Sequence, residues 1–276
     1  MGDERIDTAA DVGADGFDAS RRRFLQGAAA GAVLLAALAG SRAWARGRPE
    51  PLARWTRELV DLNERVARGE LAVADWQARI ERLNASVAVD DLVAWLDIDR
   101  LVRAFRYPTR LADVADPLLP ADLVSPGAHR AWFVRVFGMR RDGAIIPHVH
   151  NHMVSAHLVV SGAFHARTHD RLRDLDDAVV LRPSIDLRLA RGDIISMSDR
   201  RDNQHWLVAL EDRSLTFDVG VVDLAASWPY RLAANRYNMI FVDADAKPQA
   251  DGLVVAPVMS FEACAAKYAG VGGAQV

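Results

Sequence analysis

Most of the chain after Ala128 consists of short runs of β-forming residues separated by Gly, Asp and Pro. The predicted strands lie near residues 130–139, 144–150, 154–161, 163–170, 178–182, 186–190, 193–197, 204–210, 214–222 and 237–243. Many short, closely spaced strands are typical of a double-sheet jelly roll or a small barrel, in which each strand buries one face in a shared interior. The predicted fold class is therefore mainly β, a jelly roll of the double-stranded β-helix type with helices only at its ends.

The chain before Pro108 has a helical pattern instead. Apolar residues recur at intervals of three and four from Leu52 to about Val87, and Gly69 interrupts them, which predicts two helices. A third helix is predicted from Asp90 to Phe105. Because the apolar positions of these helices include several aromatic residues, we expect them to pack against the rest of the domain rather than to bind a ligand.

The predicted organisation has five parts. They are a signal peptide at residues 1–45, a helical N-terminal segment at 46–106, an irregular proline-containing connection at 107–129, the β-barrel at 130–245 and a C-terminal extension with a short helix at 246–276.

The N-terminal residues have the three-part pattern of a twin-arginine export signal. The stretch Ser20-Arg21-Arg22-Arg23-Phe24-Leu25-Gln26 is followed by an apolar run over 27–40 and by small residues at Ala43 and Ala45. That run has about fourteen residues, whereas a membrane-spanning helix needs roughly twenty. We therefore expect cleavage after Ala45, export of the folded protein to the periplasm by the twin-arginine machinery, and no stable membrane span afterwards. The alternative is an uncleaved anchor helix.

The charge balance and the cysteine count narrow the possible partners. The net charge is −3, from 34 Lys and Arg against 37 Asp and Glu, which gives no reason to expect nucleic acid or an anionic membrane as a partner. Cys264 is the only cysteine, so an intramolecular disulfide is impossible. It lies in a helix-like stretch near the C-terminus, where we expect a buried, unreactive thiol.

The histidines are concentrated in one region. Six of the eight, at positions 148, 150, 152, 157, 165 and 169, fall within 22 residues. His148 and His150 are two residues apart, so on one strand their side chains share a face, and His205 lies on a later predicted strand that can return to the same interior. Neutral imidazoles bind iron, zinc, copper and nickel. We predict that His148, His150 and His205 bind one divalent transition metal; the alternative is a solvated histidine-rich strand.

Two stretches of the chain resemble the motifs of the cupin superfamily. Gly143-(x4)-His148-x-His150-(x11)-Gly162 is similar to the first cupin motif, and Gly192-Asp193 leading to His205 is similar to the second. Most cupins carry a glutamate four or five residues after the second histidine, where this chain has Ser155 and no acid. In this it resembles the thiol dioxygenases, which bind ferrous iron with three histidines.

Among the thiol dioxygenases, the chain most resembles the branch that contains cysteamine dioxygenase and plant cysteine oxidase. It covers residues 133–231, including the runs 133–137, 146–150 and 158–165, the Phe217-Asp218-Val219 stretch and the Trp228-Pro229-Tyr230 stretch. The resemblance puts Asp218 in the place of an acid near the iron and so suggests a catalytic role for it. Two departures are an insertion before Pro229 and a serine, Ser198, in place of the proline of the second motif.

Other residues leave alternatives open. In a shifted frame His150 and His152 form the ligand pair and His157 takes the glutamate position, although His152 is then two residues too close to Gly162. We therefore expect His152 and His157 near the metal without binding it. His165, Arg167 and His169 should share a face that is exposed. Arg135 is expected to point outward, its alternative being a clamp for a substrate carboxylate.

The resemblance implies an exported Fe(II)-dependent dioxygenase that acts on a small thiol or a related small molecule. One alternative is a cupin with Zn, Mn or Ni and non-oxidative chemistry such as isomerisation or hydrolysis. Another is a protein that binds a metal or ligand without catalysis. Metal identity separates the first two, and an open coordination position separates both from the third.

Overall fold

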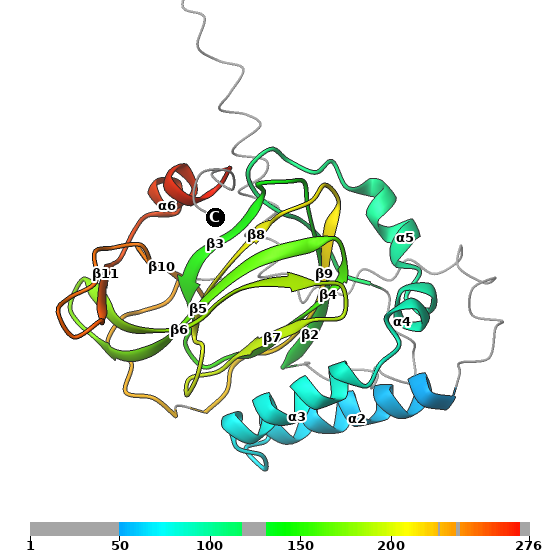
Figure 1. Ribbon diagram of the computed structural model, residues 1–276. Coiled ribbons are helices and arrows are strands. Elements are labelled where there is room, and N and C mark those ends of the chain that lie inside the picture. The colour runs from blue at the N-terminus through cyan, green and yellow to red at the C-terminus, as the bar shows by residue number, and fades with distance from the viewer. Residues whose placement is uncertain (1–49, 118–130, 226, 236–237, 271–276) are drawn as a thin grey trace, which may run out of the picture.

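The computed structural model describes residues 50–117, 131–225, 227–235 and 238–270 (Figure 1). The predicted signal peptide at residues 1–45 lies outside these ranges, as does most of the connection after Pro117. Among the helices of the described ranges, none combines the length and the apolar character that a membrane crossing requires.

Two antiparallel sheets form the body of the molecule. The first contains, in spatial order, β1 (Asp113–Ala115), β2 (Trp132–Met139), β9 (Ser214–Val221), β4 (Val154–Ser161) and β7 (Ile194–Met197). The second contains β10 (Ile240–Phe241), β3 (Ala144–Val149), β8 (Gln204–Ala209), β5 (Ala163–Asp174), β6 (Ala178–Ala190) and β11 (Val254–Pro257). From β2 to β9 the chain alternates between the sheets except at the β5–β6 hairpin, which is the strand order of a jelly roll. The predicted mainly β fold with an N-terminal helical segment is confirmed.

The β-region differs from the predicted one at its edges. Residues 178–190 form one strand, β6, where two were predicted, because Pro183 lies opposite His169 at a register shift, a place where a strand tolerates proline. Strand β11 was not predicted. It pairs with β6 and so brings the C-terminal extension into the second sheet. Strand β1 was also missed, and it pairs with β2 at the edge of the first sheet.

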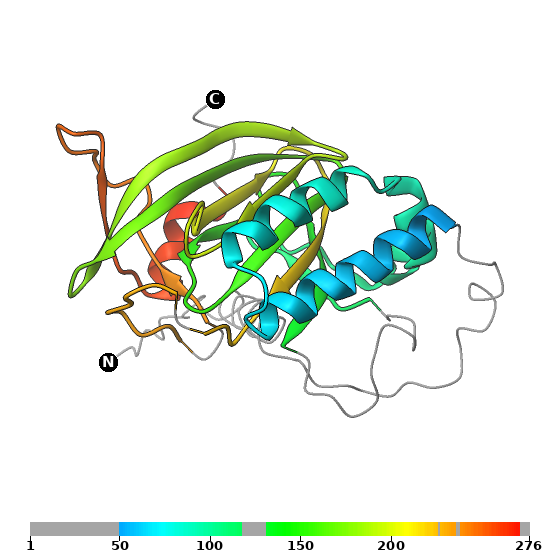
Figure 2. The ribbon, with the colours of Figure 1, turned by 90° about the horizontal axis from the view of Figure 1, so that it is seen from below.

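Helices cover the outer face of the first sheet. Helices α2 (Glu50–Ala67) and α3 (Val73–Ala85) lie side by side across it, as Figure 2 shows. Their buried residues form one apolar core with the outward side chains of the sheet; members of this core include Trp55, Leu59, Trp76, Ile80, Val134, Val136, Ala156, Leu158, Phe217 and Val219. The predicted pair of helices on either side of Gly69 is therefore present, and it packs on the outer face of β2, β9, β4 and β7.

The third predicted helix, from Asp90 to Phe105, is broken. The structure has α4 (Val89–Trp95), α5 (Ile98–Leu101) and a 3-10 turn, η1 (Val102–Ala104). Asp97 adopts φ 49°, a left-handed conformation that ends one helical segment before the next begins. Apolar spacing alone does not reveal such an interruption.

Helix α6 (Phe261–Tyr268) packs on the outer face of the second sheet. Phe261 and Tyr268 lie in an apolar cluster with Ile146 and Val208, which point outward from β3 and β8. Cys264 belongs to the same cluster and is fully buried, and burial raises the pKa of its thiol to about 12. The expectation of a buried thiol at this position is confirmed.

The interior between the two sheets has an apolar part and a polar part. The apolar part includes Met139, Val159, Phe164, Ala166 and Leu207. The polar part begins two residues away on β4, β5 and β8 and also includes Asp218 on β9; Asp218, His157, Thr168 and His205 are all buried. The jelly roll therefore holds a buried polar region beside its apolar core.

Candidate metal centre

A bulge in β3 turns His148 into the interior. In the pairing of β3 with β8, Ile145 lies opposite Leu207 and His148 lies opposite His205, with a register shift between Ile145 and His148. Residues three apart on a regular strand point to opposite faces, so the extra residue of the bulge is what lets both Ile145 and His148 face inward. His148 is thereby placed beside His205 on the neighbouring strand.

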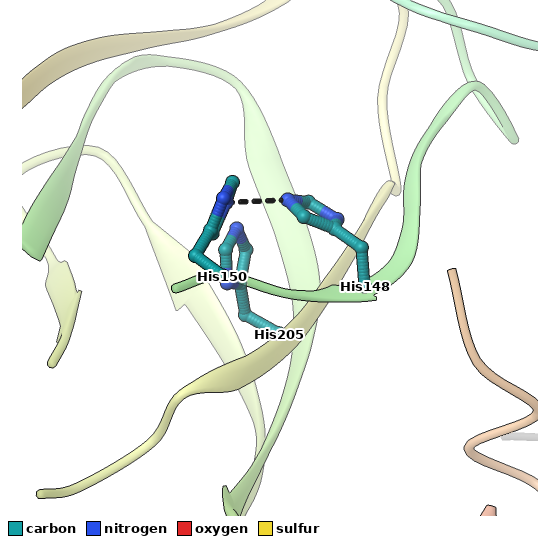
Figure 3. Close-up of side chains that lie close together, drawn as sticks. All are labelled: His148, His150 and His205. Atoms are coloured by element: carbon teal, nitrogen blue, oxygen red, sulfur yellow. Dashed lines mark hydrogen bonds between the residues drawn. The ribbon is translucent and has the colours of Figure 1, made fainter. Parts of the chain in front are cut away.

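His148, His150 and His205 converge on one point, as Figure 3 shows. One nitrogen from each ring lies within 4.8 Å of the other two, and the Nε2 atoms of His148 and His150 are 2.9 Å apart. The His148 and His205 ring centroids are 4.2 Å apart. All three residues are buried, at 3%, 4% and 2% exposure. The structure thus brings together the three histidines that were predicted as ligands.

Main-chain carbonyls hold the opposite nitrogen of each ring. Nδ1 of His148 donates to the Ile146 carbonyl at 2.7 Å, Nδ1 of His150 to the Asn238 carbonyl, and Nδ1 of His205 to the Asn203 carbonyl at 3.4 Å. A carbonyl oxygen only accepts, so each Nδ1 carries the proton and each neutral ring presents an Nε2 lone pair. Three lone pairs therefore point into one buried space.

Burial keeps these rings neutral. It lowers the pKa of His148 to about 4, and it is the largest cause that holds the pKa of His150 and of His205 well below the usual value. The other imidazoles of the group lower the pKa of His150 and His205 further, because like charges repel. Neutral imidazole is the form that binds a metal.

The donor set fits a transition metal. Two imidazole nitrogens that each lie about 2.1 Å from one ion, at right angles, are roughly 3.0 Å apart. The 2.9 Å between Nε2 of His148 and Nε2 of His150 agrees with this value. Since both nitrogens carry lone pairs, a cation between them relieves their repulsion.

The opposite wall of the interior carries a histidine and a carboxylate. Nδ1 of His157 on β4 donates to Oδ2 of Asp218 on β9 at 2.6 Å, and the two residues are direct partners in the sheet. Nε2 of His157 lies 3.2 Å from the Ser155 hydroxyl, and its ring centroid is 5.1 Å from that of His205. Asp218 was expected to orient His205 or to bind a metal-bound group, and its hydrogen-bond partner in the structure is His157.

The position of Arg135 differs from the expected one. It was predicted to point outward, yet it is 4% exposed and lies opposite Asp218 in the pairing of β2 with β9. Its Nε donates to Asp116 at 3.0 Å, and its guanidinium lies over the Phe133 ring at 4.3 Å. Because the helices cover the other face of the sheet, the apolar residues Val134 and Val136 face them, and Arg135 takes the inward position.

His152 lies apart from the three converging histidines. Strand β3 ends at Val149, and His152 has φ 54°, a left-handed conformation that breaks the period of two. Its Nδ1 donates to the Leu224 carbonyl and its ring packs on Tyr230. The shifted frame, with His150, His152 and His157 as ligands, is not assembled in the structure.

The outward-facing row of β5 is less exposed than expected. His165 binds Asp186 at 2.6 Å and is partly buried, and Arg167 pairs with Asp245 at 2.9 Å. His169 is 8% exposed and its Nδ1 donates to Gln204. The expectation of an exposed face was wrong for His169, because this histidine pairs with Gln204 on the neighbouring strand and is covered there.

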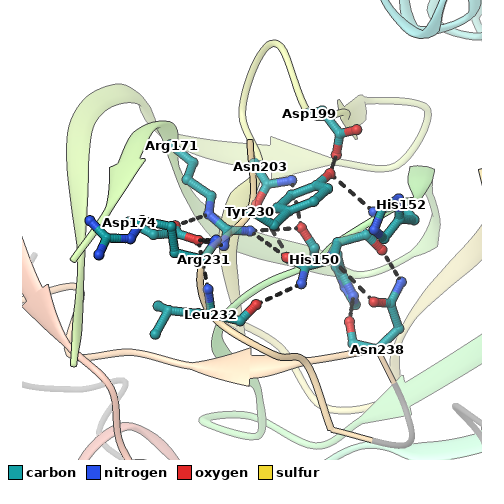
Figure 4. Close-up of polar contacts among 11 residues, drawn as sticks. His150, His152, Arg171, Asp174, Asp199, Asn203, Tyr230, Arg231, Leu232 and Asn238 are labelled. Atoms are coloured by element: carbon teal, nitrogen blue, oxygen red, sulfur yellow. Dashed lines mark hydrogen bonds and ion pairs between the residues drawn. The ribbon is translucent and has the colours of Figure 1, made fainter. Parts of the chain in front are cut away.

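A polar network behind His150 was not predicted. The Arg171 guanidinium donates to both oxygens of Asp174 and to the His150 carbonyl at 3.0 Å (Figure 4). Asn203 and Asn238 hold the main chain of residues 150 and 151 from two other directions. The only signal of such contacts in the sequence is the presence of asparagines in loops. Asparagines are so common in loops that this signal does not identify the ones involved.

No protein-family model matches the chain, and no curated protein matches it. Solved structures similar to it include KdgF from Halomonas sp., with 21% identity and a TM-score of 0.28, covering 40% of this chain and 80% of that one. Another is the Cnp3 cupin domain of Schizosaccharomyces pombe, with 10% identity and a TM-score of 0.29, covering 41% and 65%. A third is procruciferin, the 11S globulin of Brassica napus, with 12% identity and a TM-score of 0.32, covering 46% and 29%. The description of this chain as a jelly roll rests on its own strand order, and that of its centre rests on three buried, converging imidazoles.

Proposed function

We propose that this protein is an exported metalloprotein of the cupin type that binds one divalent transition metal through Nε2 of His148, His150 and His205. The observation that carries this proposal is the direction of the three lone pairs, which the main-chain carbonyls at Nδ1 impose. Three protein ligands leave coordination positions for other molecules, as catalytic sites require.

We further propose that the metal is Fe(II) and that the reaction is the oxidation of a small thiol by dioxygen. The sequence likeness to the thiol dioxygenases supports this, together with the position of Ser155, where most cupins have a glutamate ligand. When bound, ferrous iron would orient the thiol and dioxygen and activate them. Zinc, manganese or nickel at the same three imidazoles would point to non-oxidative chemistry instead.

His157 and Asp218 are suited to a role in proton transfer. The carboxylate accepts a hydrogen bond from Nδ1 of His157, so Nε2 of that ring is the acceptor that faces Ser155. In the described part of the chain, the second carboxylate oxygen of Asp218 is buried and has no hydrogen-bond partner. A substrate proton that reaches this wall therefore has two acceptors, His157 Nε2 and Asp218 Oδ1.

Metal analysis and oxygen uptake test this proposal. Protein purified from its own periplasm should contain about one equivalent of iron, measured by elemental analysis. With full iron occupancy it should consume dioxygen when cysteamine or cysteine is added. Absence of uptake with a panel of thiols would remove the thiol reaction, and a different native metal would favour the non-oxidative alternative.

Export is tested separately. The Arg21→Lys, Arg22→Lys double variant should stay in the cytoplasm at full length, whereas the wild-type protein should appear in the periplasm with a new N-terminus after Ala45. Cell fractionation with N-terminal sequencing measures both. Periplasmic delivery of the double variant would exclude the twin-arginine route.

A further inference from the structure

Two asparagines, the buried Asn203 and the partly buried Asn238, contact the metal centre in the same way. The main-chain carbonyl of each accepts a hydrogen bond from Nδ1 of one predicted ligand, His205 for Asn203 and His150 for Asn238. Each also uses its side-chain amide to bind both the N–H and the C=O of a residue in the segment 150–151. The two residues come from different loops, one before β8 and one before β10.

Asn203 links two of the ligands. Its Oδ1 accepts from the His150 main-chain N–H at 3.3 Å, and its Nδ2 donates to the His150 carbonyl at 3.2 Å and to the Ser198 carbonyl at 3.3 Å. Its own carbonyl is the partner of His205 Nδ1. A shift of Asn203 therefore moves the main chain under one ligand and the carbonyl behind another.

Asn238 holds the other side of the same segment. Its Oδ1 accepts from the Asn151 main-chain N–H at 3.3 Å, and its Nδ2 donates to the Asn151 carbonyl (Figure 4). Its backbone has φ 59°, a left-handed conformation that asparagine adopts more readily than most residues. This conformation belongs to the geometry that presents its carbonyl to His150 and its amide to Asn151.

The chemistry of these contacts calls for a primary amide. A main-chain N–H and C=O pair needs one acceptor and one donor, and of the short side chains only asparagine offers both in a planar fork. The segment after Val149 lies beyond the end of β3, so no sheet pairing fixes it. The two amides supply there the hydrogen bonds that a neighbouring strand would otherwise supply.

We propose that Asn203 and Asn238 are positioning residues of the metal centre, which fix the ring orientation and tautomer of His205 and His150 and hold the segment 150–151 in place. This inference rests on the proposed function, because it presupposes that the three imidazoles bind a metal. The side chains do not bind the metal themselves. Partners of this kind behind metal ligands typically change metal affinity by 10–100-fold when they are removed.

The test is Co(II) binding to the purified apoprotein and to two variants, Asn203→Ala and Asn238→Gly. Asn238→Gly removes the amide but tolerates the left-handed backbone, so the carbonyl of residue 238 stays available. We expect each variant to bind Co(II) at least tenfold more weakly in chelator competition. We also expect the visible absorption bands of the Co(II) form to change in position or intensity, which loss of stability alone would not cause.

Asn63→Ala is the matched control. Asn63 is buried like Asn203 and accepts a hydrogen bond from Trp76 at 3.0 Å, but it lies between helices α2 and α3, away from the barrel interior. This variant should lower stability and leave Co(II) affinity and spectrum unchanged. If Asn203→Ala does not fold, Asn238→Gly alone decides the question.

The outcomes separate this inference from the proposed function. If wild-type protein and both variants bind Co(II) equally well with the same spectrum, the positioning role is wrong and the metal site stands. If the wild-type protein binds no metal, the proposed function is wrong and this inference fails with it. If Asn203→Ala and Asn238→Gly bind Co(II) at least tenfold more weakly and Asn63→Ala does not, the result supports both the metal site and the positioning role.

Discussion

The barrel interior has two walls, one on the side of each sheet, and both carry buried histidines. The hydrogen-bond partners of these histidines differ between the walls. On the side of the second sheet, His148 and His205 on the strands and His150 just beyond the end of β3 donate from Nδ1 to main-chain carbonyls. On the first sheet, Nδ1 of His157 donates a hydrogen bond to the carboxylate of Asp218. A carbonyl fixes the tautomer without adding a charge, whereas a carboxylate adds one.

This difference assigns different chemistry to the two walls. Three neutral rings with converging lone pairs suit a cation, and the negative charge of such a site must come from elsewhere. Asp218 supplies a carboxylate on the facing wall, and Arg135 lies opposite it across the strands. We therefore expect that substituting the histidines of the second-sheet wall abolishes metal binding. Substituting the polar residues of the first-sheet wall should lower turnover.

The largest expected effect comes from the second-sheet wall. The His148→Ala, His150→Ala double variant should lose stoichiometric metal completely, because one imidazole cannot hold a divalent ion in this space. Elemental analysis of the purified protein measures it. The matched change on the facing wall, His157→Ala, should keep about one equivalent. Unchanged metal in the double variant would show that the ligand assignment is wrong.

The next effect concerns the facing wall. Asp218→Asn should retain the metal but lower turnover by about 100-fold, a typical contribution of a positioned proton acceptor. The amide keeps the shape of the side chain, and its oxygen can still accept from His157, but it removes the charge that makes Asp218 a proton acceptor. Oxygen uptake by the iron-loaded variant measures turnover, and metal content is its control. Equal turnover in variant and wild type would make Asp218 a structural residue.

The buried imidazoles of the second-sheet wall should make the stability of the apoprotein depend on pH. In the folded apoprotein the pKa of His148 is lowered to about 4 and those of His150 and His205 are also lowered, whereas in the unfolded chain they are about 6.5. The unfolded chain therefore binds more protons below pH 6.5. This stabilisation is fully present above that pH and is lost as the pH falls toward 4, by on the order of 1 kcal/mol per histidine per pH unit.

Urea unfolding of the apoprotein at pH 7, 6 and 5 measures this loss. The His148→Ala, His150→Ala variant should show a clearly smaller loss over the same range, because two of the three buried rings are gone. Identical slopes for both proteins would mean that the acid sensitivity arises outside the second-sheet wall.

The smallest effect should come from the edge of the first-sheet wall. Asp116→Ala removes the carboxylate that binds the buried Arg135, and Asp116 itself is about half exposed, at 47%. We expect a loss of stability of about 1 kcal/mol, since water replaces part of the interaction. Metal content should not change. A change in metal content would show that the two walls are coupled through Arg135.

Much of the fold and the centre of the site could be predicted from local patterns. The spacing of apolar residues indicated α2 and α3, because an amphipathic helix repeats every three or four residues. The period of two in His148 and His150 indicated a shared face, because side chains alternate along a strand. The prediction of β-strands along 144–150 and 204–210 placed His205 where it could join them.

Other features required the tertiary structure. Arg135 and Val134 alternate along β2, and nothing in that alternation says which of them faces the barrel interior; the helices on the outer face decide it. His152 follows the same spacing as His150, but its left-handed backbone turns it away toward Leu224 and Tyr230.

The sequence by itself determined the jelly-roll strands and the three imidazoles that meet, because strand periodicity is a local property of neighbouring residues. The tertiary structure decided the bulge between Ile145 and His148, the pairing of His157 with Asp218, and the two asparagines behind the ligands. Each of these joins residues far apart in the chain. Such contacts depend on the register between strands and on loop conformation, which only the packed molecule fixes.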